Sequence, residues 1–174
     1  MALTHRYLLV LLVANILGLV LQVAGVSNQT IDDSNVQFTY SGSWLVNSCS
    51  GCSPRPDSGQ AFNQTYHTSG DGDGSGSARL VFTGSAIWVY GILAPSGEQG
   101  ALTITLDAQS PVVYNSTGNS DSTYAYNALF FHASSLQSTV SHTLTLRAGR
   151  AGSVLLDCAV VSSDEPTATG TGSP

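Results

Sequence analysis

Lysine is absent from this chain of 174 residues, and charged residues of all kinds make up only 9% of it. Acidic residues outnumber basic ones, so the formal net charge at pH 7 is −6. Apart from Arg147 and Arg150, the few arginines are widely separated along the sequence, and so few cations cannot form the continuous basic surface that follows a phosphate backbone. The composition therefore argues against nucleic acid as a partner.

Amphipathic helical periodicity and internal repeats are also missing. Short apolar or alternating segments lie instead between turns rich in glycine, serine and proline. The stretch 78–91 has apolar residues at both odd and even positions, so both faces of a strand there would be apolar. This predicts a long central strand, or a strand pair bent at Gly84. Segments 101–107 and 142–147 alternate, with leucine and isoleucine facing inward. Together these segments predict an all-β domain of about eight strands, built as an antiparallel sandwich or jelly roll.

One hydrophobic run, residues 7–21, approaches the length of a membrane span. His5 and Arg6 precede it and small residues follow at Ala24 and Gly25, which is the pattern of a secretory signal peptide over residues 1–25. An uncleaved anchor helix is the alternative. With cleavage we expect no membrane span, a folded domain over 26–163 and a disordered polar tail over 164–174. The expected location is extracellular, either secreted or at the cell surface.

Asparagine, serine and threonine form sequons that agree with secretion. These sequons begin at Asn28, Asn63 and Asn115. A sequon that carries a glycan must lie on the surface, so we expect each asparagine to be exposed.

Cysteine is scarce, with only 3 in the chain. Cys49 and Cys52 are spaced as C-x-x-C, and in an oxidising compartment without a βαβ unit this spacing predicts a short structural disulfide. Cys158 lies in an apolar segment, where an unpaired cysteine is expected to be buried. A bridge from Cys158 to Cys49 or Cys52 stays open, because connectivity cannot be derived from sequence.

Metal ligands have little support. Asp71, Asp73 and Ser75 alternate as in the first half of a calcium loop. The twelfth position of such a loop would be Phe82, where a bidentate glutamate is needed, so a glycine-rich turn is the simpler interpretation. The scattered histidines do not have the spacing of a zinc site. We expect no metal and no cofactor.

Catalysis has little support either. A glycosidase needs two carboxylates across the scissile bond, but most acids here lie in turn-rich loops, and no G-x-S-x-G motif is present. Asp107 and Asp157, each at the end of a strand, are expected to satisfy backbone donors. We expect a protein that is not an enzyme, although a cluster of buried carboxylates would reopen that possibility.

Sugar binding requires flat apolar faces together with a few placed polar groups. Trp44 and Trp88 could supply such faces, but in a sandwich we expect both to be packed. Aromatic residues in loops are better candidates. The predicted ligand-binding residues are Tyr66, His67, Tyr124, Tyr126, Asp107 and Arg79.

The order of several segments resembles a known family. The segments are Phe82-Thr-Gly-Ser-Ala-Ile-Trp-Val-Tyr-Gly91, Leu106-Asp107, His142-Thr-Leu-Thr-Leu146 and Leu156-Asp157. They resemble the galactose-binding-domain-like β-sandwich over Ile31 to Ser163, most of all the secreted or surface jelly-roll proteins of mushroom-forming fungi. The resemblance implies a non-catalytic module that binds carbohydrate or cell-wall glycan. The alternative is a structural or adhesion domain that binds protein partners without a sugar site.

Overall fold

The structure is a computed structural model that describes residues 25–49, 52–69, 74, 76–95, 100–115, 121, 123–150 and 152–165. The chain divides into two units, one of residues 1–25 and 165–174 and the other of residues 26–164. The second unit holds nearly all of the described residues. The predicted signal sequence before Gly25, the calcium candidates Asp71, Asp73 and Ser75, and the predicted tail beyond residue 165 lie outside the described residues.

Eleven strands and two 3-10 helices form the described part of the chain. In chain order they are β1 (Gly25–Asp32), β2 (Phe38–Ser41), β3 (Trp44–Val46), η1 (Ser58–Gln60), η2 (Phe62–Gln64), β4 (His67–Ser69), β5 (Ser77–Thr83), β6 (Ala86–Leu93), β7 (Leu102–Leu106), β8 (Val112–Tyr114), β9 (Ala125–Ala133), β10 (Ser141–Ala148) and β11 (Leu155–Glu165). The all-β prediction is confirmed, but the strand number was too low. β11 also runs through Asp164, beyond the predicted end of the domain at residue 163.

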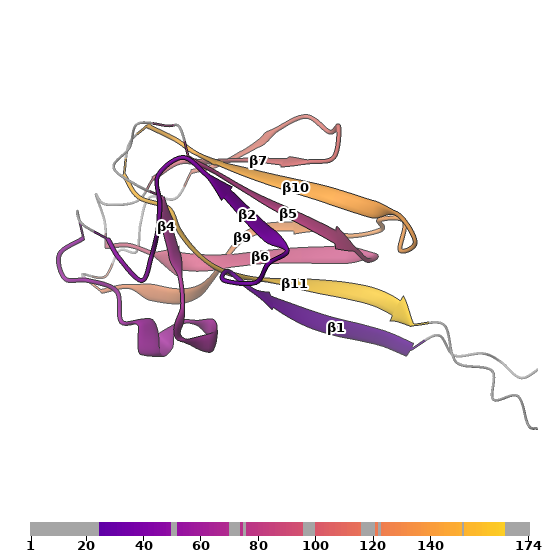
Figure 1. Cartoon of the computed structure of the whole chain (residues 1–174), viewed down its shortest axis with the longest axis horizontal. Helices are drawn as coiled ribbons and strands as arrows, with labels where there is room; N and C mark the ends of the chain where they lie inside the picture. Colours follow the sequence, from indigo (N-terminus) through magenta and orange to yellow (C-terminus); the bar gives the residue numbers. More distant parts are fainter. Residues whose placement is uncertain are drawn as a thin grey trace, which may run out of the picture. The chain divides into compact units, whose positions relative to one another are not determined.

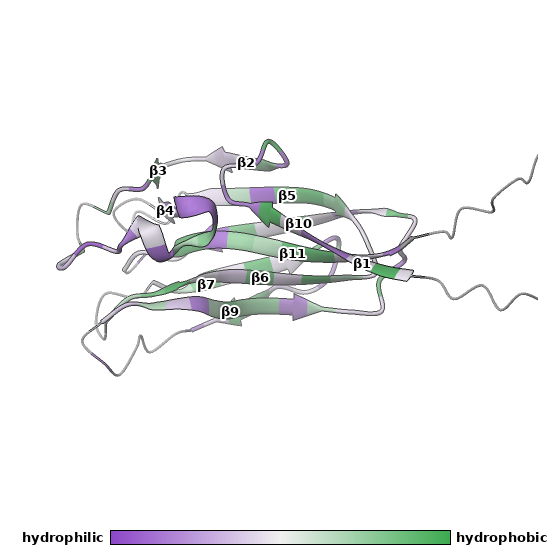
Figure 2. Cartoon of the chain, turned by 90° about the horizontal axis from the view of Figure 1, so that it is seen from below, coloured by the Kyte–Doolittle hydropathy of each residue, from purple (hydrophilic) through white to green (hydrophobic). Residues whose placement is uncertain are grey.

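The strands form two sheets. One has the order β3-β4-β11-β6-β9 with β1 also paired to β11, and the other has the order β2-β5-β10-β7-β8. Figure 1 shows β1 alongside β11, and Figure 2 shows hydrophobic residues along β5, β6, β10 and β11. The inner faces of the two sheets enclose one core, to which both sheets contribute fully buried residues such as Leu80, Val89, Leu144 and Leu156. This is an antiparallel β-sandwich, as predicted.

The stretch 78–91 is a bent pair of strands rather than one continuous strand. β5 and β6 belong to different sheets, and the chain crosses between them at Gly84 and Ser85. A Cβ atom at Gly84 would lie 2.5 Å from Cγ1 of Val161 and 2.6 Å from the carbonyl oxygen of Ser162. Glycine is therefore required where the crossing passes against β11.

The two tryptophans have different environments. Trp44 is partly buried and packs against the core, as expected. Trp88 lies on the outer face of β6, because Ile87 and Val89 occupy the inward positions on either side of it. Its indole stacks on the ring of His132 with 5.0 Å between centroids. Trp88 is thus partly buried, as Trp44 is, but it packs on His132 rather than against the core.

The cysteines follow the prediction. A disulfide joins Cys49 and Cys52, whose Cα atoms are 5.3 Å apart, and Cys158 is unpaired and buried. Asn28, Asn63 and Asn115 are all exposed. Among the described residues, no helix is long and apolar enough to cross a membrane.

Candidate functional site

A cavity of about 350 Å³ opens where the loop after Cys52 meets the residues that lead into β9. Its lining residues are Pro54, Arg55, Asp57, Gln60, Thr123, Tyr124 and Tyr126. We call this cavity the tyrosine pocket. The pocket combines two aromatic rings with charged and amide side chains, which is the mixture that small-ligand sites use.

Two hydrogen bonds tie the tyrosine rings to the facing loop. The Asp57 backbone N–H donates to Tyr126 Oη at 2.7 Å, and Tyr124 Oη donates to the Pro54 carbonyl oxygen at 2.9 Å. Beneath the rings lies a small apolar cluster that includes Tyr66, Ile92 and Leu155, against which both tyrosines pack. The rings are thus fixed from below by packing and at their tips by the loop.

The loop itself is held in shape by Asp57. Its Oδ1 accepts the N–H of Gly59 at 2.9 Å, which caps η1, and its Oδ2 accepts from the Gln60 side chain at 3.2 Å. Both oxygens therefore make bonds within the loop and each keeps a lone pair for a further donor. Gln60 is held at the rim of the pocket by the same contacts.

Burial and one cation shift the pKa values of two phenols here, Tyr66 beneath the pocket and Tyr126 in its lining. Burial raises the pKa of Tyr66, Tyr126 raises it further, and the nearby positive charge of Arg55 opposes the rise. Burial also raises the pKa of Tyr126. Both phenols therefore stay protonated at neutral pH. Because Tyr126 Oη already accepts from Asp57, its own proton can be donated to a ligand.

A second polar cluster lies beneath η2, where β1, β4 and β11 come together. Asp33 and Asp157 have no exposed surface, and Asp32 is only 8% exposed. The Thr65 hydroxyl lies 3.0 Å from Asp32 Oδ2 and 2.8 Å from Asp33 Oδ1. The His67 ring nitrogen Nδ1 contacts Asp33 Oδ2. We call this group of three aspartates, Thr65 and His67 the acid cluster.

Burial dominates the electrostatics of the acid cluster. It raises the pKa of Asp157 to about 6, a rise opposed by the N–H of Phe62 and reinforced by Asp33 and Asp32. Burial also raises the pKa of Asp33, although hydrogen bonds from His67 and Thr65 oppose that rise. Asp157 Oδ1 accepts the Phe62 N–H at 2.9 Å, whereas Asp157 Oδ2 has no hydrogen-bond partner among the described residues.

The acid cluster meets the condition that would reopen a catalytic interpretation, because it groups buried carboxylates. Asp33 and Asp157 are, however, closed to solvent, and the ring of Tyr40 covers His67 with 4.0 Å between the ring centroids. A substrate cannot reach these carboxylates in this structure. Asp157 instead satisfies the backbone of η2, as predicted for an acid at the end of a strand.

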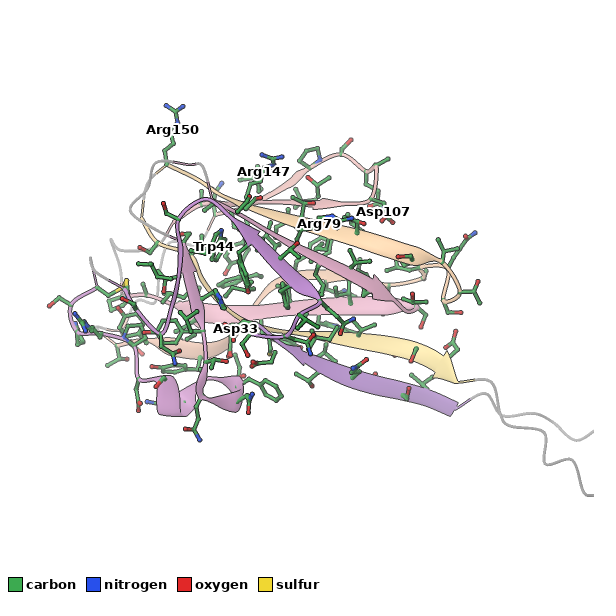
Figure 3. All side chains as sticks on the ribbon, in the orientation of Figure 1. Asp33, Trp44, Arg79, Asp107, Arg147 and Arg150 are labelled. Atoms are coloured by element: carbon green, nitrogen blue, oxygen red, sulfur yellow. A yellow bond between two sulfur atoms is a disulfide. The ribbon has the colours of Figure 1, made fainter. Side chains whose placement is uncertain are left out.

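The predicted ligand-binding residues fall into three places. Tyr124 and Tyr126 line the tyrosine pocket, and Tyr66 packs beneath them. His67 belongs to the acid cluster, where it contacts Asp33 and is 8% exposed, and it does not line the tyrosine pocket. Arg79 and Asp107 both contact Thr143 on the five-stranded sheet, and Figure 3 shows them well apart from Asp33. Arg79 and Asp107 do not lie near the tyrosines, because their contacts with Thr143 hold them on the five-stranded sheet.

Asp107 has a structural role in that second place. Its backbone is left-handed, with φ of 51°, its Oδ1 accepts the Thr143 N–H at 2.7 Å, and its Oδ2 lies 2.8 Å from His142 Nδ1. Asp107 thus satisfies a backbone donor, as predicted. In the same view Arg147 and Arg150 extend away from the domain (Figure 3).

Five of the seven lining residues were not predicted, and three of them, Arg55, Asp57 and Gln60, bring charged or amide side chains from the loop after Cys52. The sequence indicates only a turn-rich loop for their segment. The signal that could have identified them is an arginine between two prolines, next to a disulfide, since such a segment presents its charge from a constrained backbone.

No family model and no curated protein sequence matches this chain. Among solved structures, it is similar to a family two carbohydrate esterase from Cellvibrio japonicus, with a TM-score of 0.52 and 13% identity over 80% of this chain and 34% of that chain. An exo-beta-1,3-galactanase from Phanerochaete chrysosporium gives a TM-score of 0.48 and 15% identity over 78% of this chain and 29% of that one. This chain thus spans about a third of the esterase and less of the galactanase. The likeness to the esterase supports the β-sandwich fold, consistent with the galactose-binding-like resemblance.

Proposed function

We propose that the domain is a non-catalytic carbohydrate-binding module and that the tyrosine pocket holds a sugar residue of a glycan, such as one of the cell wall. The observation that carries the proposal is the pair of fixed rings, Tyr124 and Tyr126, beside the polar side chains of Arg55, Asp57 and Gln60. Sugar rings present flat C–H faces and a rim of hydroxyl groups. An aromatic wall with a few polar groups at its edge complements both.

Preorganisation supports the same proposal. Each tyrosine is held by a hydrogen bond to the loop and by the apolar cluster beneath it, so little side-chain freedom is lost when a ligand binds. The pocket volume of about 350 Å³ lies near the lower end of the range for ligand sites, which suits a small unit such as a terminal sugar.

The disposition of the acids favours binding over hydrolysis. Among the described lining residues, only Asp57 carries a carboxylate, and both of its oxygens already accept hydrogen bonds within the loop. Glycoside hydrolysis needs a second carboxylate across the sugar, and in the acid cluster Asp33 and Asp157 have no exposed surface while Asp32 is only 8% exposed. The fold similarity to a carbohydrate esterase agrees with a carbohydrate-related role without adding to the support for this pocket.

An extracellular location is part of the proposal. It is supported by the signal-peptide pattern of residues 1–25, by the disulfide between Cys49 and Cys52, and by the exposure of all three sequon asparagines. An oxidising compartment is where such a disulfide persists.

A glycan array with the purified chain, followed by titration calorimetry, tests the function. Tyr124→Ala should abolish binding of the glycans that the wild-type chain retains, while the melting temperature shows that the domain is folded. Trp88→Ala is the matched control, because Trp88 pairs with His132 at the opposite end of β9 and also has an aromatic face outside the core.

Two outcomes would contradict the proposal. Silence of the wild-type chain across the array would favour the adhesion domain without a sugar site. Glycan binding that survives Tyr124→Ala but disappears in Trp88→Ala would move the site to the outer face of β6.

A further inference from the structure

We propose that the tyrosine pocket selects an acidic sugar, a hexuronic acid residue, and that Arg55 binds its carboxylate. This inference rests on the proposed function and adds the chemical class of the ligand. It follows from the charge and the hydrogen-bond inventory of the residues that line the pocket.

Arg55 is a cation without an acidic partner in the described part of the chain. The acidic side chains that contact a basic side chain there are Asp33, beside His67, and Asp107, beside His142. Arg55 is exposed and lines the pocket beside the tyrosine rings. A guanidinium group presents its N–H donors as a planar fork that matches the two oxygens of a carboxylate.

The acid of the pocket does not neutralise Arg55. Asp57 Oδ1 accepts from the Gly59 backbone and Asp57 Oδ2 accepts from Gln60, so its carboxylate is oriented by the loop rather than by the guanidinium group. The remaining lone pairs of Asp57 can accept sugar hydroxyl groups, and Tyr126 can donate to one. Cation, aromatic wall and acceptors together match the carboxylate, ring face and hydroxyl groups of one uronic acid.

The charge of the surroundings favours a carboxylate over a more highly charged group. Among the described lining residues, only Arg55 is a cation, and Asp57 adds a negative charge to the same lining. The whole chain also has a net charge of −6. A phosphate with close to two negative charges would meet repulsion from Asp57 without a second cation to offset it. A singly charged group with a planar pair of oxygens fits best.

Titration calorimetry with three matched ligands tests the inference: a galacturonic acid trimer, its methyl ester and neutral galactotriose. The wild-type chain should bind the acid roughly tenfold or more tightly than the ester, as expected for a hydrogen bond to a charged group. Arg55→Gln should bring the affinity for the acid down to that for the ester and leave the ester unchanged. Arg55→Lys should retain only part of the preference, because an ammonium group lacks the planar fork.

Arg79→Gln is the matched control, since Arg79 is an exposed arginine on the other sheet and should leave all affinities unchanged. Equal affinity of the wild-type chain for acid, ester and neutral trimer would overturn the uronic acid inference while leaving the sugar pocket in place. Equal or tighter binding of a sulfated galactose would also overturn it, because the pocket would then accept anions in general. Absence of binding to every ligand of a full array would overturn the proposed function itself.

Discussion

Replacing Asp157 by asparagine should stabilise the domain at neutral pH. Asp157 has no exposed surface, and its Oδ2 lacks a hydrogen-bond partner among the described residues. Burial raises its pKa from 3.8 to about 6, and the negative charges of Asp33 and Asp32 add to the rise. Asparagine has nearly the same shape and keeps an oxygen that can accept the Phe62 N–H, but it carries no charge to desolvate.

The sign and size of the effect follow from the two pKa values. The folded chain holds this proton more tightly than the unfolded chain, so the stability that the protonated carboxyl supplies is complete below pH 3.8. It is lost as the pH rises through about 6. At about 1.4 kcal/mol for each pH unit, the loss amounts to about 3 kcal/mol at pH 7. Asp157→Asn avoids this loss.

Urea denaturation at a series of pH values measures the difference between Asp157→Asn and the wild-type chain. The free energy of unfolding should be about 3 kcal/mol higher for the variant at pH 7.5 and similar for both at pH 3.5. Acids outside the acid cluster titrate alike in both proteins and cancel in the difference. Asp164→Asn, at an exposed carboxylate, is the control and should show no such difference. A variant less stable than wild type at pH 7.5 would refute the reasoning, because the ionised carboxylate would then be stabilising.

Three further predictions concern other parts of the sandwich. Hydrogen bonds to Asp107 and, more weakly, to the Gln137 carbonyl raise the pKa of His142. An NMR titration of His142 should therefore give a midpoint above 6.5, and Asp107→Asn should lower that midpoint. The stability that protonated His142 contributes should be complete below pH 6.5 and should be lost as the pH rises through the raised pKa. Gly84→Ala should cost about 1–3 kcal/mol in urea denaturation, since its Cβ would lie 2.5 Å from Val161 and 2.6 Å from the Ser162 carbonyl oxygen; a variant as stable as the wild-type chain would contradict the close approach. Burial raises the pKa of the Cys158 thiol to about 12, so a thiol reagent at pH 8 should modify it only after denaturation, and rapid modification of the folded chain would disprove its burial.

The strands that the sequence predicts well are those whose burial alternates. In β7 and β10 every second residue is buried, and the leucines and the isoleucine face inward as expected. β1 was missed because its residues are polar and mostly exposed, and its extended form comes from pairing with β11 at the far end of the chain. Residues 61–67 have the local composition of a short strand, but most of them form η2 and its connection to β4. Local propensity does not encode such distant pairings.

The site was predictable in its aromatic half only. Tyr124 and Tyr126 stand out in the sequence as aromatic residues next to a polar loop, and both line the pocket, Tyr124 just before β9 and Tyr126 at its start. In the sequence, Arg55 and Gln60 look like ordinary residues of a turn. They come to the pocket because Asp57 caps η1 and the Asp57 N–H donates to Tyr126, a residue far away in the chain. The acid cluster was hidden for the same reason, since its aspartates and His67 come from three separate segments.

The acid cluster and the tyrosine pocket are connected through one segment of chain, which explains why a costly buried carboxylate lies where it does. Residues 53–66 make little sheet pairing and need other acceptors for their backbone N–H groups. Asp157 supplies one for Phe62, and Asn47 supplies another for Tyr66 at 3.0 Å. Between these anchors and the disulfide at Cys52, the chain is held so that Asp57 and Gln60 face the tyrosines. The stability lost at Asp157 therefore falls at a carboxylate that supports the loop lining the pocket, because Asp157 accepts the Phe62 N–H.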